Sequence, residues 1–230
     1  MTQRSILTGE HQTIIIKVGA SVTVKGYEGD LVTAETKDRG GLSLERRSES
    51  EIGRARAALG DHVLFDVRIK LPNVKEKNSS NEVVEVQMSG SGEVLVPFSS
   101  SLKIYAGKDI DVQDVKGRVD AYSGLNLTLK DVYGLGNVSA GKAMSIDCQT
   151  IIANDVTFSA GSDLRFHVAD MTSARLRVKD IGGYWEARLG DAEKSVYLKS
   201  GGEVTFVTDQ KVEPLPPNYV LGKIEKPTQA

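Results

Sequence analysis

Two consecutive stretches of the sequence have almost the same pattern. Residues 103–115 read KIYAGKDIDVQDV and residues 120–132 read DAYSGLNLTLKDV, which places Gly107 and Gly124 17 residues apart. In each stretch a small residue, Ala106 or Ser123, directly precedes the glycine. Apolar residues follow at matching offsets, and an acid and a valine end the unit. A short unit at a fixed spacing is typical of repeat proteins, in which neighbouring units form a shared core.

The repeat extends well beyond these two units. Glycines recur at separations of 17, 17, 20, 21 and 19 residues, at Gly107, Gly124, Gly141, Gly161, Gly182 and Gly201. The positions three and five residues after each glycine are all apolar: Ile110, Leu127, Met144, Leu164, Trp185, Val204, and then Val112, Leu129, Ile146, Phe166, Ala187 and Phe206. Most units also have apolar residues three and five positions before the glycine. Before Gly182 the corresponding pair, Leu176 and Val178, is displaced by one residue, which we interpret as a bulge or an extra loop residue.

Apolar and polar residues alternate within each unit, as in DIDVQD and LNLTLKD. Alternation with period two is typical of short strands that have one buried face and one exposed face. The glycines between the strands favour sharp corners, at which we expect a positive φ. The sequence therefore predicts an all-β fold, a single-stranded β-solenoid (β-helix) with coils of about 17–21 residues.

The N-terminal part has the same alternation without the regular spacing. It predicts strands at residues 13–18, 21–26, 31–36, 42–46, 62–71, 82–88 and 93–98. Ser48 and Glu51 have the spacing of a capping box, which predicts a short helix or loop insertion near residues 47–60. We predict an N-terminal β region (1–96) continuous with the solenoid, a repetitive solenoid (97–209) and a proline-containing C-terminal tail (210–230).

The charge balance limits the partners that we expect. Lysine and arginine total 29 against 31 acids, a net charge of −2, which gives no electrostatic reason to expect nucleic acid. No apolar stretch is long enough to span a membrane, and the start does not have the pattern of a signal peptide. We therefore expect no membrane insertion and a cytoplasmic location, or the cell surface if a leader or anchor was removed.

No residue pattern predicts a catalytic, cofactor or metal site. His11, His62 and His167 each stand alone, without the spacing of metal ligands. Cys148 is the only cysteine, and it continues the apolar alternation of its unit, which predicts a buried thiol. The glycines of GLGNVSAG (134–141) lack the lysine of a phosphate-binding loop. We predict that the protein is not an enzyme and needs no cofactor.

Five outward-facing residues are the candidate binding surface. Asp109, Asp111 and Asp120 recur on successive units, together with Asp114 and Asp131, so their carboxylates could line one outer face. Such acids could bind calcium or cleave polysaccharide, although interleaved lysines favour a solvated face of mixed charge. Tyr105 and Tyr122 should point outward and stack on adjacent coils, either as cross-coil packing or as a platform for sugar rings.

Three segments together resemble a bacterial domain family of unknown function whose members are described as adhesins. The first has the pattern V-x-V-x-G-x-x-x-D-x-V at Val22, Val24, Gly26, Asp30 and Val32. The others match at Val96, Pro97, Leu102 and Ile104, and then at Asp109, Ile110, Val112, Val115, Gly117 and Val119. The resemblance spans most of residues 12–209 and implies a repetitive β-solenoid without established catalytic residues.

The resemblance and the repeat together favour a non-catalytic binding or structural module, with a protein or a glycan as its partner. A self-associating scaffold similar to the bactofilins is the first alternative. A β-helix protein that binds or cleaves polysaccharide is the second alternative.

Overall fold

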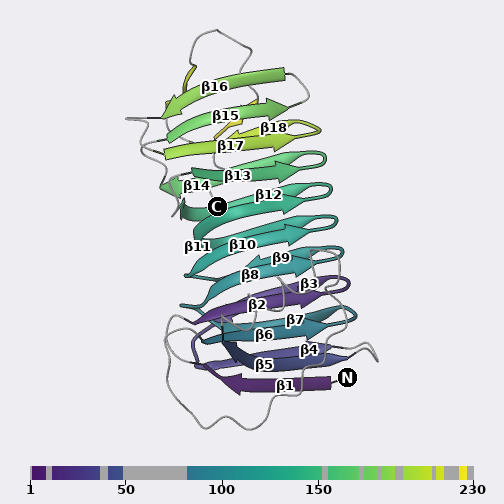
Figure 1. Ribbon diagram of the computed structural model, residues 1–230. Helices are drawn as coiled ribbons and strands as arrows, with labels where there is room; N and C mark the ends of the chain where they lie inside the picture. The colour runs from purple at the N-terminus through teal and green to yellow at the C-terminus, as the bar shows by residue number, and fades with distance from the viewer. Residues whose placement is uncertain are drawn as a thin grey trace.

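The computed structural model describes residues 2–8, 12–36, 41–48, 82–151, 155–170, 174–180, 183–189, 194–208, 211–214 and 223–226. Every regular element in these ranges is a strand, and the strands form one 20-stranded sheet. The sheet winds into an elongated β-solenoid whose coils stack along a single axis (Figure 1). The predicted fold class is therefore confirmed.

Each regular coil contributes one strand to each of two walls. In order along the axis, wall A consists of β5 (Leu42–Ser48), β6 (Glu82–Met88), β2 (Thr13–Val18), β8 (Ser101–Ala106), β10 (Arg118–Ser123), the second half of β11 (Leu127–Ala140), β13 (Asp155–Ala160), β17 (Lys194–Ser200), β15 (Ala174–Asp180), β16 (Gly183–Leu189) and β19 (Glu213–Pro214).

Wall B consists of β1 (Thr2–Leu7), β4 (Leu31–Thr36), β7 (Gly92–Pro97), β3 (Val22–Tyr27), β9 (Ile110–Gln113), the first half of β11, β12 (Met144–Ile151), β14 (Leu164–Asp170), β18 (Val204–Val207) and β20 (Lys223–Glu225).

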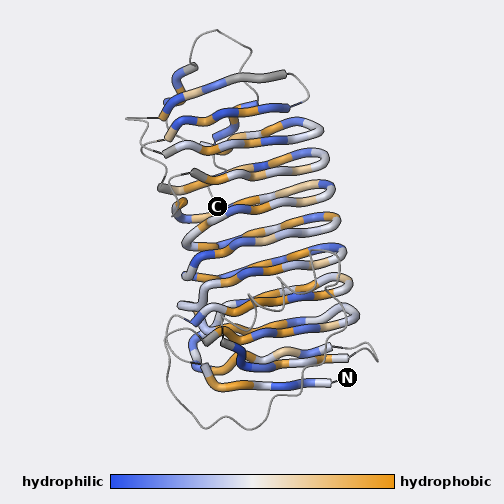
Figure 2. Tube along the Cα trace, viewed as in Figure 1, coloured by the Kyte–Doolittle hydropathy of each residue, from blue (hydrophilic) through white to orange (hydrophobic). Residues whose placement is uncertain are grey.

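The core lies between the two walls and consists of one layer of apolar side chains per coil. Figure 2 shows hydrophobic and hydrophilic residues alternating along the strands, as the period-two pattern requires. The predicted inward positions whose side chains are described are buried: Ile110, Leu127, Met144, Leu164, Val204, Val112, Leu129, Ile146, Phe166, Ala187 and Phe206. Phe166 packs with Phe158 and Phe206, at ring-centroid distances of 5.2 Å and 5.4 Å.

The corner glycines are needed for close approach between coils and not for a positive φ. A Cβ atom on Gly124 would lie 2.1 Å from the carbonyl oxygen of Gly107, and one on Gly141 would lie 2.1 Å from that of Gly124. The φ angles of these glycines lie outside the left-handed region, so the expectation of positive φ was wrong. The left-handed non-glycine residues among those described are Asp114 (φ 57°) and Asp131 (φ 52°), each at the end of a wall B segment.

The coils near the N-terminus do not stack in sequence order. The coil formed by β2 and β3 lies between the β6–β7 coil and the β8–β9 coil, and it pairs in parallel with both neighbours on each wall. In Figure 1 the purple strands β2 and β3 lie between bluer strands that come much later in the chain. The predicted strands at 13–18, 31–36 and 82–88 match β2, β4 and β6, but their order along the axis was not predicted.

The unit around Gly182 is not a coil. Strands β15 and β16 form an antiparallel hairpin in which Val178 pairs with Trp185 and Asp180 pairs with Gly183. The coil of β17 and β18 stacks directly on that of β13 and β14, which places Gly201 against Gly161. Leu176 and Val178 on β15 pair in regular parallel register with Val196 and Leu198 on β17, so the interpretation as a bulge was wrong. The alternative, an extra loop residue, falls at residues 181–182, which lie outside the described residues.

Antiparallel strands form the N-terminal end of the solenoid. Strand β1 pairs with β4 and β5 pairs with β6, both in antiparallel register. The guanidinium of Arg46 on β5 donates a hydrogen bond to the carbonyl of Leu7 on β1, which joins the two walls. Residues 47–48, at the start of the predicted helical insertion, are the end of β5, and the rest of the insertion and the predicted strand at 62–71 lie outside the described residues.

Candidate binding face on wall A

The five predicted surface residues lie on three different sides of the solenoid. Tyr105, Tyr122 and Asp120 lie on the outer face of wall A, on the neighbouring strands β8 and β10. Asp111 lies on wall B in β9, and Asp109 lies in the corner that precedes this strand. The acids therefore do not form one carboxylate row, because Asp120 lies on wall A, Asp111 on wall B and Asp109 in the corner that precedes β9.

The two tyrosines stack across adjacent coils, as predicted. Their ring centroids are 5.2 Å apart, and their planes differ by 11°. Tyr105 also packs against Ile15 and Val83, which form a second apolar cluster separate from the core. Burial and the nearby Asp120 carboxylate raise the pKa of Tyr122. Wall A thus carries an aromatic and aliphatic cluster on its outer side.

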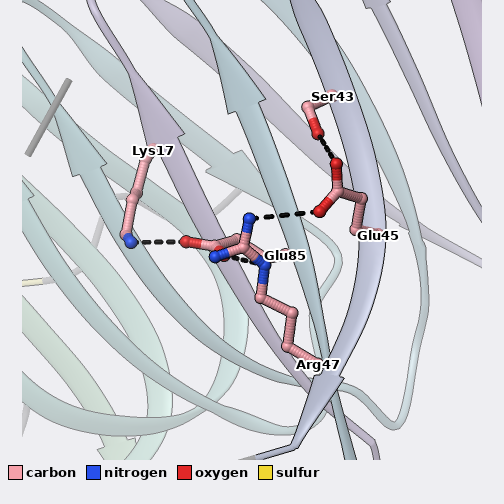
Figure 3. A network of polar contacts seen from close by, with 5 residues as sticks. All are labelled: Lys17, Ser43, Glu45, Arg47 and Glu85. Carbon is pink, nitrogen blue, oxygen red and sulfur yellow. Dashed lines mark hydrogen bonds and ion pairs between the residues drawn. The ribbon is translucent and has the colours of Figure 1, made fainter. Parts of the chain in front are cut away.

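A network of charged side chains lies next to this cluster (Figure 3). Glu85 on β6, whose side chain is 2% exposed, pairs with Lys17 on β2 and lies 3.0 Å from Nε of Arg47 on β5. Arg47 also pairs with Glu45 at 3.1 Å, and the Ser43 hydroxyl donates a 2.8 Å hydrogen bond to Glu45. The network therefore connects three neighbouring strands that are far apart in the sequence.

The pKa of Glu85 shows which interaction prevails in the network. Burial alone would raise this pKa, but hydrogen bonds from Lys17 and Gln87 and the positive charges of Lys17 and Arg47 outweigh it. The pKa of Glu85 is consequently below its ordinary value. The carboxylate stays ionised, as a buried acid with cationic partners should.

Asp120 and Asp109 each connect successive coils through the backbone. Asp120 accepts two hydrogen bonds from Arg118, at 2.9 Å and 3.0 Å, and one from the backbone N–H of Asn137 at 2.8 Å. Asp109 accepts hydrogen bonds from the backbone and side-chain N–H groups of Asn126, at 3.2 Å and 2.9 Å, and one from Ser21. Partial burial would raise the pKa of Asp109, but these hydrogen bonds and Lys108 hold it below its ordinary value. Both carboxylates thus have a structural role.

Wall A carries a second concentration of polar groups at its C-terminal end, which we did not predict. The outer faces of β15, β16 and β17 present Arg175, Arg177, Lys179, Arg188, Tyr197 and Lys199. The signal was available in the alternation of ARLRVKD (174–180), which places three cations on the face opposite the buried Ala174, Leu176 and Val178. The overall charge balance does not reveal this patch, because acids elsewhere in the chain offset its cations.

Two of the four isolated titratable residues singled out by the sequence, Cys148 and His167, are described. Cys148 is buried, as predicted, and burial together with Asp147 raises the pKa of its thiol to about 12. His167 on wall B lies 3.0 Å from Asp147 of the neighbouring coil. His11 and His62 lie outside the described residues. Among the described residues, no group of three or more His, Cys, Asp and Glu side chains is arranged to hold a metal ion.

In the part of the chain that the structure describes, no helix is long and apolar enough to cross a membrane. Comparison of the chain with protein-family models, with curated proteins and with solved structures gave no match in any of the three cases. The resemblance to the bacterial adhesin family therefore stays an expectation drawn from the three sequence segments.

Proposed function

We propose that the protein is a non-catalytic binding module that presents the outer face of wall A to a glycan or protein partner. The observation that carries this proposal is the stacked pair of Tyr105 and Tyr122 on the outside of a rigid parallel sheet. Aromatic rings with one apolar side and one polar tip are favoured at binding surfaces, since they contribute large contact area at low cost in conformational entropy.

The shape of the N-terminal end supports a discrete module over a self-associating scaffold. A solenoid that grows end to end must pair its terminal strands with those of another copy. Among the described strands, those at this end, β1 and β5, are antiparallel to their neighbours, and β5 carries Glu45, Arg46 and Arg47. Charged side chains on an edge strand disfavour pairing with another chain.

The positions of the carboxylates support binding over cleavage of a polysaccharide. Glycosidases use two carboxyl groups that face one glycosidic bond across a short gap. Asp109, Asp111 and Asp120 lie on different sides, and each already accepts a hydrogen bond from a neighbouring side chain. This arrangement offers no acid and base pair from the residues that the sequence singled out.

Glycan and peptide arrays probed with the wild-type protein and two variants test the proposal. We expect Tyr105→Ser/Tyr122→Ser to lose the binding of the wild-type protein. Tyr133→Ser is the matched control, because Tyr133 is 52% exposed, follows the left-handed corner at Asp131, and is not one of the two stacked tyrosines. Equal binding by all three proteins, each shown to be folded by its thermal transition, would contradict the proposal.

A further inference from the structure

The C-terminal end of wall A brings cations of like charge into direct opposition. Lys179 on β15 is the register partner of Lys199 on β17, and Arg175 on β15 is the register partner of Arg188 on β16. Like charges opposite each other on neighbouring strands are destabilising. Two such pairs on three adjacent strands therefore need an explanation other than the stability of the solenoid.

The acids on this face do not neutralise its cations. Glu186 is shared by Arg175, at 3.1 Å from its Nε, and Arg177, at 3.4 Å. Glu213 is shared by Arg188, at 3.0 Å, and Lys211, at 3.3 Å. The ammonium groups of Lys179 and Lys199 have no ion-pair partner among the residues that the structure describes, and both side chains are exposed. The face consequently keeps an excess of positive charge.

The two lysines begin an axial row that leads to the stacked tyrosines. From one coil to the next, the register partners along the outer face are Lys179, Lys199, Ser159, Ser139, Tyr122 and Tyr105. With strands about 4.8 Å apart, this axial row is roughly 24 Å long. Beside it, the exposed Tyr197 ring lies 5.2 Å from the Arg177 guanidinium. The axial row thus combines cations, hydroxyl groups and aromatic rings.

We propose that the axial row binds a linear acidic polysaccharide. The ammonium groups of Lys179 and Lys199 would pair with acidic groups of the chain, Ser159 and Ser139 would hydrogen-bond to its hydroxyls, and a sugar ring would pack on Tyr122. This inference rests on the proposed function of wall A and names the class of its ligand. The occupant follows from charge complementarity, since the face is cationic although the whole chain has a net charge of −2.

A polysaccharide fits this face better than nucleic acid does. Nucleic acids carry a charge on every nucleotide, and proteins that bind them hold many phosphates with a basic stripe. The axial row has two cations without an ion pair among the described residues at one end, followed by neutral hydroxyl and aromatic groups, and the next register partner beyond Tyr105, Lys17, is already paired with Glu85. That distribution matches a chain with few charges and many hydroxyls.

Binding to alginate, a linear polyuronic acid, tests the inference at low ionic strength by isothermal titration calorimetry. We expect Lys179→Gln/Lys199→Gln to weaken binding about tenfold or more, because both ammonium groups lose their charge-assisted contacts with the carboxylates of the polysaccharide. Lys25→Gln/Lys130→Gln is the matched control, since both lysines are exposed on wall B, and it should bind like the wild type. Binding should also weaken as salt is added.

Neutral dextran and single-stranded DNA are the comparison probes. Alginate binding that is lost in the wall A variant and kept in the wall B variant would support the inference. Absence of alginate binding, equal loss in both lysine variants, or tighter binding of DNA would overturn it. A neutral glycan or peptide that binds through Tyr105 and Tyr122 alone would overturn this inference and leave the proposed function standing.

Discussion

The hydroxyl of Ser21 donates a 3.1 Å hydrogen bond to the carboxylate of Asp109, a residue 88 positions later in the chain. Both residues lie two positions after a corner glycine, so the bond joins equivalent points of two stacked coils. The backbone follows the same order, since the N–H of Gly107 donates to the carbonyl of Val18. The N-terminal coil is thus an interior layer of the solenoid, between coils that are consecutive in sequence.

An engineered disulfide can test this order of coils. Thr23 on β3 and Asp111 on β9 are register partners on the outer face of wall B, at a separation that suits a disulfide. We expect Thr23→Cys/Asp111→Cys, in a Cys148→Ala background, to form an intramolecular disulfide readily. On a denaturing gel the oxidised chain should migrate faster without reductant than with it.

The matched control for the cross-link is Glu93→Cys/Asp111→Cys. Glu93 on β7 pairs with Thr23, so it lies two coils from Asp111, or roughly 10 Å, which is too far for a disulfide. If coils stacked in sequence order, β7 would instead be the neighbour of β9. A cross-link in the control pair and none in the test pair would refute the observed order.

Gly124→Ala should destabilise the protein strongly. The new methyl group would lie 2.1 Å from a backbone carbonyl oxygen, which cannot move without disturbing the next coil. Overpacking of this kind costs about 1–3 kcal/mol or more. Thermal unfolding followed by circular dichroism measures the loss.

Gly41→Ala is the control, because a Cβ atom there has no neighbour within 4 Å. This substitution should be neutral or slightly stabilising, since it lowers the entropy of the unfolded chain by the equivalent of about 0.4–1 kcal/mol. Similar melting temperatures for the two variants would show that the corners are looser than the structure has them.

Glu85→Gln should cost stability at neutral pH, and the cost should fall on acidification. Removing the buried carboxylate leaves Lys17 and Arg47 without their shared partner, which costs about 3 kcal/mol for a buried pair. The folded-state pKa of Glu85 lies below its ordinary value of 4.5, so its contribution is fully present above pH 4.5 and is lost as the pH falls through the folded value.

Urea unfolding of the wild type and the variant, between pH 7 and pH 3, measures this difference. Glu93→Gln is a suitable comparison, because Glu93 is half exposed and lies 3.7 Å from Lys25, where an ion pair contributes little. A constant difference between wild type and Glu85→Gln across the pH range would argue against the ion-pair network.

Cys148 should be inert in the folded protein. Its thiol is buried and its pKa is about 12, so almost no thiolate exists at pH 8. We expect 5,5′-dithiobis(2-nitrobenzoic acid) to label the protein only after unfolding in urea. Because the folded state keeps a proton that the unfolded state releases above pH 9, this group should also lower stability as the pH rises toward 12. Rapid labelling of the native protein would contradict the buried position.

The local structure of this protein follows from the pattern of its residues alone. Alternation at period two decides which side chains of a strand face inward, because it depends only on neighbouring residues. The glycine spacing marks the corners of the coils, where a larger residue would clash with the next coil. Ile110, Leu127 and Met144 could therefore be assigned to one buried column, and the outward position of Tyr105 and Tyr122 followed from the same parity.

Which coils are neighbours, and in which direction their strands pair, depends on contacts between distant parts of the chain. Backbone hydrogen bonds along a sheet are the same for every sequence, so β2 could pair with any coil of suitable shape. Parallel and antiparallel strands also share the same alternation, which is why the hairpin of β15 and β16 resembled another coil. The stacking order was set by contacts between distant residues, such as Ser21 with Asp109 and Lys17 with Glu85. It also brought Lys179 and Lys199 into line with Tyr122 on one face.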